Sequence, residues 1–165
     1  DKEYPEQLRQ IADPPYLLFY KGDVSLLSKK TVSVVGTRRL TQNGKIAAKE
    51  FAYNAALNGE VVVSGLAKGA DEYAHRGVVD AYFDCFEKGL DTSNLGKTIA
   101  VLPSSIDEIV PFSNKKLAGQ ILQTGGLAIG ATHNKSRFFN SAILKASSRV
   151  LTPNCCPFSS INSSS

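Results

Sequence analysis

Two short segments constrain the fold of this chain most, because in each an apolar, β-branched run ends at a glycine and a helical pattern follows. The first is Val32–Arg39, VSVVGTRR, and the second is Val61–Asp71, VVVSGLAKGAD. In α/β folds such turns lie at the carboxyl ends of parallel strands, where backbone N–H groups and the positive ends of helix dipoles face outward. Both turns also carry cationic side chains. The pattern therefore predicts a site for an anionic group.

The rest of the chain repeats this alternation of strands and helices. Strands are predicted over Tyr16–Tyr20, Thr31–Val35, Val61–Ser64, Thr98–Leu102, Leu127–Ala131 and Arg149–Thr152, and helices over about Gln42–Asn58, Ala70–Asp84, Ser113–Thr124 and Asn140–Ala146. Such alternation with short joints specifies a parallel sheet with right-handed crossovers. We predict an α/β protein with a Rossmann-like three-layer fold, a mainly parallel sheet and a short N-terminal strand extension.

The helical segments carry apolar residues that recur every three to four positions. These residues are Ile46, Phe51, Ala52 and Ala55 in the first helix, Ala70, Ala74, Val78 and Ala81 in the second, and Leu117, Ile121 and Leu122 in the third. We expect these faces to cover the sheet.

The length of 165 residues fits one domain. The predicted division is an N-terminal lead over residues 1–23 packed on the core, a Rossmann-like domain over residues 24–152, and a serine-rich, disordered tail over residues 153–165. No stretch approaches the roughly 20 apolar residues of a membrane span, so we expect a cytoplasmic protein. The three cysteines have neither metal-ligand spacing nor the even number of a disulfide framework, and are expected to be reduced thiols.

The net charge of +4 conceals an uneven distribution of charge. Residues 109–165 contain no Asp or Glu, and neither do residues 29–49, although both stretches contain several Lys and Arg. Basic charge that is segregated in this way favours a polyanionic partner such as nucleic acid. An ordinary solvated face is the alternative that composition leaves open.

The first turn contains Gly36, Thr37, Arg38 and Arg39. Because the next glycine is Gly44, the spacing of a dinucleotide-binding fingerprint is absent and NAD binding is disfavoured. What the turn offers is a close backbone approach, a hydroxyl donor and a guanidinium able to bind phosphate through two hydrogen bonds. A plain strand-to-helix joint with exposed arginines is the alternative interpretation.

The second turn is richer in groups that suit phosphate. Gly65 and Gly69 allow a tight loop, Ser64 offers a hydroxyl at the strand end, and Lys68 supplies a point charge.

Two titratable residues follow this turn in the predicted helix. Asp71 is expected to cap free N–H groups in the first helical turn, a structural role that we favour over a catalytic one. His75 lies one helical turn further on, so the two side chains are expected to pair, with the imidazole buried.

Taken together, the motifs resemble the bacterial DNA-processing protein A (DprA/Smf) family over roughly residues 4–126. The matching segments are Tyr4-Pro5, Pro14–Asp23, Val34–Arg38, Ser64–Asp71 with Ala74-His75, Gly96–Leu102, and Ile106-Asp107 with Pro111 and Asn114–Ala118. The resemblance implies a Rossmann-like domain that binds single-stranded DNA, forms a homodimer and loads RecA onto DNA during natural transformation. We predict no cofactor and no metal site.

The family's phosphate-binding turns match positions of this sequence. Gly36, Thr37 and Arg38 match the first turn, with Arg39 beside them, and Ser64, Gly65, Lys68 and Gly69 match the second. In the last third of the chain, Lys135, Arg137, Phe138 and Phe139 offer charge and a stacking surface. Packing in the core is the alternative interpretation of the two phenylalanines.

The sequence also departs from the family pattern. Tyr82–Leu95 is longer than the usual joint, Ile129-Gly130 replaces a Ser-Glu pair, and an Arg-Asn-Arg element appears only as Phe139-Asn140-Ser141. The resemblance therefore ends at about residue 126.

Three functions remain open, of which a non-catalytic single-stranded DNA binder is preferred. A nucleoside-monophosphate phosphoribohydrolase is disfavoured because Thr124-Gly125-Gly126 matches only part of its motif and no carboxylate follows Glu108. A sensor for a small nucleotide would use the same turns. We predict no catalytic residue.

Overall fold

The computed structural model describes residue 9, residues 17–131 and residues 149–152. The elements in chain order are β1 (Leu18–Gly22), η1 (Val24–Ser28), β2 (Thr31–Val34), α2 (Gln42–Leu57), β3 (Val61–Ser64), α3 (Ala70–Glu87), β4 (Thr98–Leu102), η2 (Phe112–Asn114), α4 (Lys115–Gln123), β5 (Leu127–Ala131) and β6 (Arg149–Leu151). Here η denotes a short 3₁₀ helix. The strands β3, β4 and β5 have the predicted bounds.

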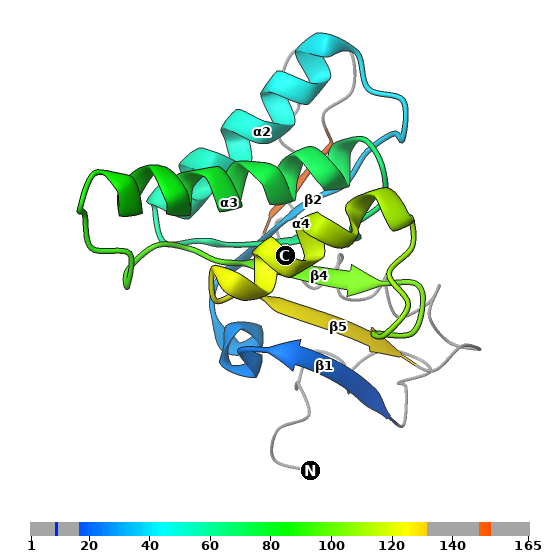
Figure 1. Ribbon diagram of the computed structural model, residues 1–165. Coiled ribbons are helices and arrows are strands. Elements are labelled where there is room, and N and C mark those ends of the chain that lie inside the picture. The colour runs from blue at the N-terminus through cyan, green and yellow to red at the C-terminus, as the bar shows by residue number, and fades with distance from the viewer. Residues whose placement is uncertain (1–8, 10–16, 132–148, 153–165) are drawn as a thin grey trace.

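One sheet with the strand order β1-β5-β4-β3-β2-β6 organises the molecule (Figure 1). Each neighbouring pair from β5 to β6 is parallel, and β1 joins the edge by antiparallel pairing with β5. The predicted α/β fold with a mainly parallel sheet and an N-terminal strand extension is confirmed.

The helices α2, α3 and α4 cover one face of this sheet. Small side chains let them approach it closely: Ala52, Ala74 and Val78 pack on Val62, and Ala118 and Ile121 of α4 pack around Ala100 and Ala128. The second helix buries all four of the residues predicted for its apolar face. This packing fixes the helix N-termini at the carboxyl edge of the strands.

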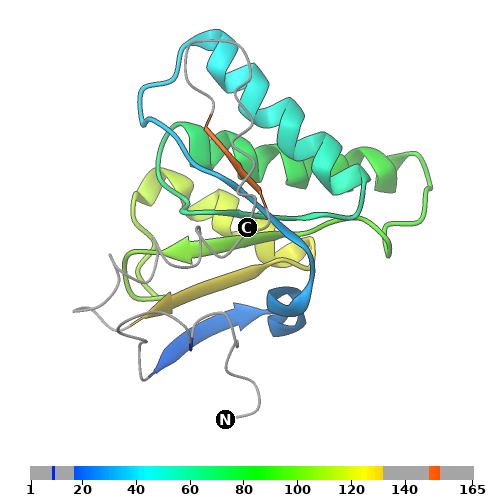
Figure 2. The same ribbon diagram turned by 180° about the vertical axis from the view of Figure 1, so that it is seen from behind.

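The opposite face of the sheet carries a separate apolar cluster. Val63, Ile99 and Ile129 of the strands are buried there together with Leu26 of η1. Seen from behind, η1 lies beside β1 at the sheet edge (Figure 2). The predicted three-layer arrangement also involves the helix expected over Asn140–Ala146, which lies outside the described residues.

Two details of the helices differ from the prediction. The helix α3 ends at Glu87 rather than Asp84, because Cys85 continues its buried face and a residue with positive φ, Gly89, stops it afterwards. In α2, Ile46 is 55% exposed, because the residues that face the sheet are Ala48, Ala52, Ala55 and Ala56. Within the described ranges no helix has the length and apolar character needed to cross a membrane.

Candidate functional site

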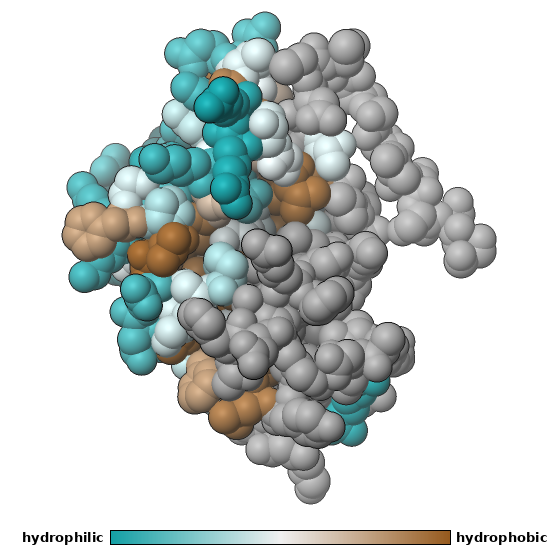
Figure 3. All heavy atoms as spheres, turned by 90° about the vertical axis from the view of Figure 1, so that its right-hand side faces the viewer, coloured by the Kyte–Doolittle hydropathy of each residue, from teal (hydrophilic) through white to brown (hydrophobic). Residues whose placement is uncertain are grey.

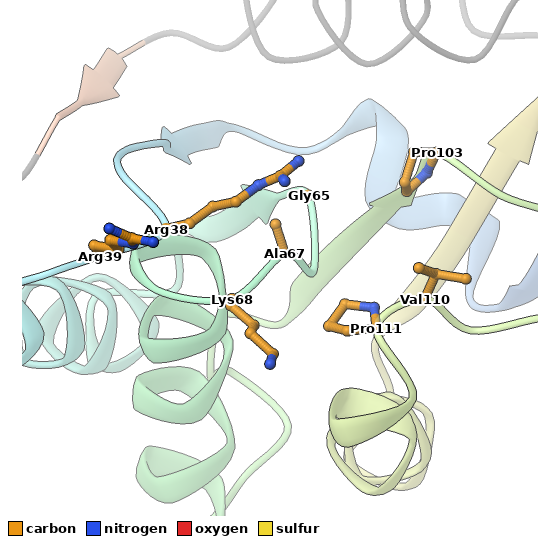
Figure 4. A pocket seen from close by; sticks show the side chains of 8 residues that line it. All are labelled: Arg38, Arg39, Gly65, Ala67, Lys68, Pro103, Val110 and Pro111. Carbon is orange, nitrogen blue, oxygen red and sulfur yellow. The ribbon is translucent and has the colours of Figure 1, made fainter.

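The carboxyl ends of three adjacent parallel strands surround a cavity of about 340 Å³ (Figure 4). Its lining comes from the segment after β2 (Arg38 and Arg39), the segment after β3 (Gly65, Ala67 and Lys68) and the segment after β4 (Pro103, Val110 and Pro111). In open α/β sheets this edge is where ligands bind. The structure thus brings the two predicted turns together at one cavity.

The two turns touch through their backbones. The N–H of Ala70 donates to the carbonyl of Thr37 at 3.2 Å. Gly69, with φ +86°, leaves no room for a side chain, since a Cβ there would overlap the Thr37 carbonyl oxygen. The contact fixes Arg38 and Lys68 relative to each other and places the N-terminus of α3 beside the first turn.

Thr37 is oriented by its own turn. Its Oγ1 accepts from the backbone N–H of Arg39 at 3.1 Å, while the residue is exposed. The hydroxyl proton is then available for a ligand, because a hydroxyl can accept and donate at once. Gly36 is likewise exposed.

Ser64 lies beneath the second turn rather than on its surface. It is fully buried, and its hydroxyl donates to the carbonyl of Val34 at 2.6 Å. The structure gives Ser64 the role of tying β3 to β2 below the cavity, in place of the ligand contact expected from its position at the strand end.

A buried asparagine supports the second turn, and the sequence analysis did not single it out as a site residue. Leu66 has φ +61° and is fully buried, an arrangement that is uncommon for a residue with a Cβ. The side chain of Asn114, just before α4, donates to the Leu66 carbonyl at 3.0 Å. The signal that could have found it is its place within the family-like segment Asn114–Ala118.

Asp71 lies directly behind the cavity wall. A Cβ on Gly65 would come within 2.7 Å of Asp71 Oδ2. Burial raises the pKa of Asp71 to about 6, although the neighbouring Ser64 side chain, the backbone N–H groups of Ala67 and Gly65 and the nearby charge of Arg38 all lower it. A carboxyl group that titrates near neutral pH therefore backs the cationic site.

The predicted pairing of His75 with Asp71 is wrong. His75 Nδ1 is hydrogen bonded to Thr98 Oγ1 on β4 at 2.7 Å, and Thr98 Oγ1 also lies 3.0 Å from the carbonyl of Val62. The imidazole is fully buried, as expected, and burial lowers its pKa to about 3. His75 is thus a neutral core residue at physiological pH.

The cations of the acid-free stretch over residues 29–49 differ in whether a carboxylate pairs with them. Lys30 forms an ion pair with Glu60, and Lys49 forms one with Asp80. In the described part of the chain no carboxylate lies within ion-pair distance of the cavity cations Arg38, Arg39 and Lys68. Hydrophilic side chains gather in the upper part of the face seen in Figure 3, which views the side on which β4 ends.

Three further predicted site residues, Lys135, Arg137 and Phe138, lie outside the described residues. The described ranges contain no group of three or more His, Cys, Asp or Glu side chains able to hold a metal ion.

Fold and cavity together define a Rossmann-like α/β protein with a cationic cavity at the carboxyl ends of its central strands. The chain belongs to the DNA recombination-mediator protein A family, whose model matches residues 1–145. It is 34% identical over 131 residues to Protein Smf of Borreliella burgdorferi, which covers 79% of this chain. It is 38% identical over 121 residues to DNA processing protein DprA of Streptococcus pneumoniae, which covers 73% of this chain. The chain spans 38% of the length of each of these relatives.

Solved structures agree with this assignment. The X-ray structure of DNA processing protein A from Streptococcus pneumoniae superposes with a TM-score of 0.70 at 32% identity, covering 92% of this chain and 51% of that one. DNA processing protein A from Helicobacter pylori, whose structure concerns a unique single-stranded DNA binding mode, superposes with a TM-score of 0.71 at 29% identity, covering 90% and 65%.

Proposed function

We propose that this chain binds the phosphate backbone of single-stranded DNA at the carboxyl edge of β2, β3 and β4, without catalysing a reaction. One observation carries the proposal. Arg38, Arg39 and Lys68 line one cavity, and in the described part of the chain no carboxylate pairs with them. Unpaired cations at a strand-to-helix edge suit an anion, and a chain of phosphates supplies anions in series.

The groups in the cavity read phosphate rather than base edges. Guanidinium and ammonium groups, the Thr37 hydroxyl and backbone amides position a strand without reporting its sequence. We therefore expect little sequence preference. Gly36 is exposed and allows close backbone approach, whereas Gly69 contributes by letting the second turn pack against Thr37. Lys135, Arg137 and Phe138 belong to the same proposal as further contacts.

The wider role follows from the family. We propose action in DNA uptake by natural transformation, with loading of RecA onto the bound strand and assembly as a homodimer. Single-stranded DNA binding by the Helicobacter pylori relative supports the first step of this role.

Two other functions use the same cavity. A nucleotide sensor would place one phosphate there, and a phosphoribohydrolase would need a carboxylate at the ribose. Asp71 is the carboxyl group behind the cavity, but it lies beneath Gly65 and is engaged by the turn's own N–H groups. We expect no release of adenine from AMP, and clear enzyme-dependent release would favour hydrolysis instead.

The deciding experiment is a salt titration of oligonucleotide binding by fluorescence anisotropy. A polyanion that occupies several cations gives a steep slope of log affinity against log salt, whereas a mononucleotide gives a shallow one. Arg38→Ala and Lys68→Ala should each weaken binding and reduce the magnitude of the slope by about one.

The matched control is Lys88→Ala, because Lys88 is exposed and lies at the far end of α3 from the cavity. It should leave affinity and slope unchanged. If both cavity variants keep a native circular dichroism spectrum and bind DNA with the affinity and salt slope of the parent protein, the proposed site is contradicted.

A further inference from the structure

The cavity has two walls of different chemistry. The cations Arg38, Arg39 and Lys68 lie on one side, and Val110 and Pro111 lie across from Lys68 on the other (Figure 4). An inorganic anion needs only the cationic wall. The apolar wall implies a ligand that is itself both charged and apolar, as a nucleotide is.

The segment that forms the apolar wall is followed in the chain by an exposed aromatic residue. Phe112 follows Pro111 directly, so its Cα lies about 3.8 Å from that of a cavity-lining residue. The residue is 79% exposed, and its neighbour Val110 is 50% exposed. A single exposed apolar side chain needs no functional explanation, but exposed apolar residues within and directly after the segment that lines a charged cavity indicate a binding surface.

A cation accompanies this ring. Lys115 Nζ lies 5.6 Å from the centroid of the Phe112 ring, within the range of a cation–π contact. An aromatic face beside a lysine is the arrangement with which proteins hold single strands, the base stacking on the ring and the cation meeting the backbone.

The rim is held in register with the cationic turn. Asn114, two residues after Phe112, donates to the Leu66 carbonyl of the second turn at 3.0 Å. On the same loop, Asp107 is neutralised by an ion pair with Lys21 at 2.7 Å. The segment that carries Phe112 is therefore attached to the cationic turn by a buried hydrogen bond two residues further on, which favours a preorganised site.

We propose that Phe112 is a stacking platform for a nucleobase of the strand whose phosphates occupy the cationic wall, with Lys115 binding a neighbouring phosphate. The inference rests on the proposed binding of single-stranded DNA and assigns the base contact of that site. The cation over the ring, Lys115, together with the cavity cations, favours a nucleic acid strand over an apolar protein surface as the occupant.

The test compares a normal oligonucleotide with an abasic strand of equal length and charge. The parent protein should bind the normal strand more tightly. Phe112→Ala should weaken binding of the normal strand by about tenfold and leave the abasic strand unchanged, because only base stacking is removed. Phe112→Tyr, which keeps the aromatic face, should restore the preference.

Phe86→Ala is the matched control, since Phe86 is 64% exposed but lies near the far end of α3, 16 residues from Ala70. A 2-aminopurine base in the strand supplies a direct readout, since its fluorescence should be quenched by the parent and much less by Phe112→Ala.

The outcomes separate the two proposals. If the parent binds neither strand, the proposed function fails. If the parent binds the normal strand and Phe112→Ala binds it equally well with the same quenching, the stacking site is refuted while DNA binding stands. If Phe112→Ala weakens binding of the abasic strand as much as that of the normal strand, the stacking role is refuted as well, because the ring then contributes without a base.

Discussion

The backbone of Gly69 lies directly against the backbone of Thr37. A Cβ on residue 69 would overlap the Thr37 carbonyl oxygen and come within 2.8 Å of Arg38 Cα. The first turn, which carries the arginines, and the start of α3 therefore depend on a single position without a side chain.

Gly69→Ala tests this dependence. The substitution forces a side chain into a backbone with φ +86° and into contact with the first turn, so we expect a loss of about 2 to 3 kcal/mol of stability. We also expect oligonucleotide affinity to fall, because Arg38 must move. Urea denaturation and anisotropy measure the two effects.

Gly89→Ala is the control for backbone strain alone. Gly89 has φ +67°, but a Cβ there meets nothing within 4 Å. It should cost about 1 kcal/mol, through the backbone conformation, with DNA affinity intact. Equal losses of affinity in the two variants would mean that the contact with Thr37 does not position the site.

Asn114→Ala should destabilise the protein by about 1 to 3 kcal/mol, because it leaves the buried carbonyl of Leu66 without its partner. DNA affinity should fall as well, since the second turn loses the bond that holds it to the apolar rim. Asn54→Ala, at an exposed position on α2, should change neither quantity. Parental stability in Asn114→Ala would show that the bond contributes nothing.

The raised pKa of Asp71 predicts that the stability of the folded protein depends on pH. Its pKa is raised from 3.8 to about 6 in the folded state, so the folded protein binds more protons between these values than the unfolded chain does. The free energy of unfolding is therefore higher by up to about 3 kcal/mol below about pH 4 than at neutral pH. This stabilisation is lost as the pH rises through about 6. Denaturation of Asp71→Asn should lack this fall, and an identical pH profile would contradict the assignment.

The same carboxyl group should affect DNA binding. Above about pH 6 the ionised Asp71 attracts Arg38 from behind the cavity, so affinity should rise as the pH is lowered from 7.5 to 5.5. Asp71→Asn removes this contribution. Because histidine as a residue type titrates in this pH range, the parent and Asp71→Asn are compared in a His133→Gln background.

Much of the fold follows from the sequence because the central strands are uninterrupted apolar runs bounded by glycine turns. Val61–Ser64 and Thr98–Leu102 are buried on both faces, so their composition alone distinguishes them. The two cationic turns follow from the same pattern, since parallel strands bring their carboxyl ends to one edge.

The remainder of the site depends on tertiary contacts that no local pattern contains. Helical spacing placed Asp71 and His75 one turn apart, but the imidazole reaches Thr98 on a strand 23 residues further along the chain. The apolar rim arises from a loop after β4 whose prolines and valine carry no chemical signature. Their role is visible only once this loop lies opposite the cationic turns.

The order of strands in the sheet also bears on how the protein folds. Val32 of β2 and Val62 of β3, which are partners, are 30 residues apart, whereas the edge partners Leu18 and Ala131 are 113 apart. Closing short loops costs less entropy, so we expect the β2–α2–β3 unit to form before the edges. The unit that bears the first cationic turn and leads into the second would then be ordered early, while the antiparallel edge closes the sheet late.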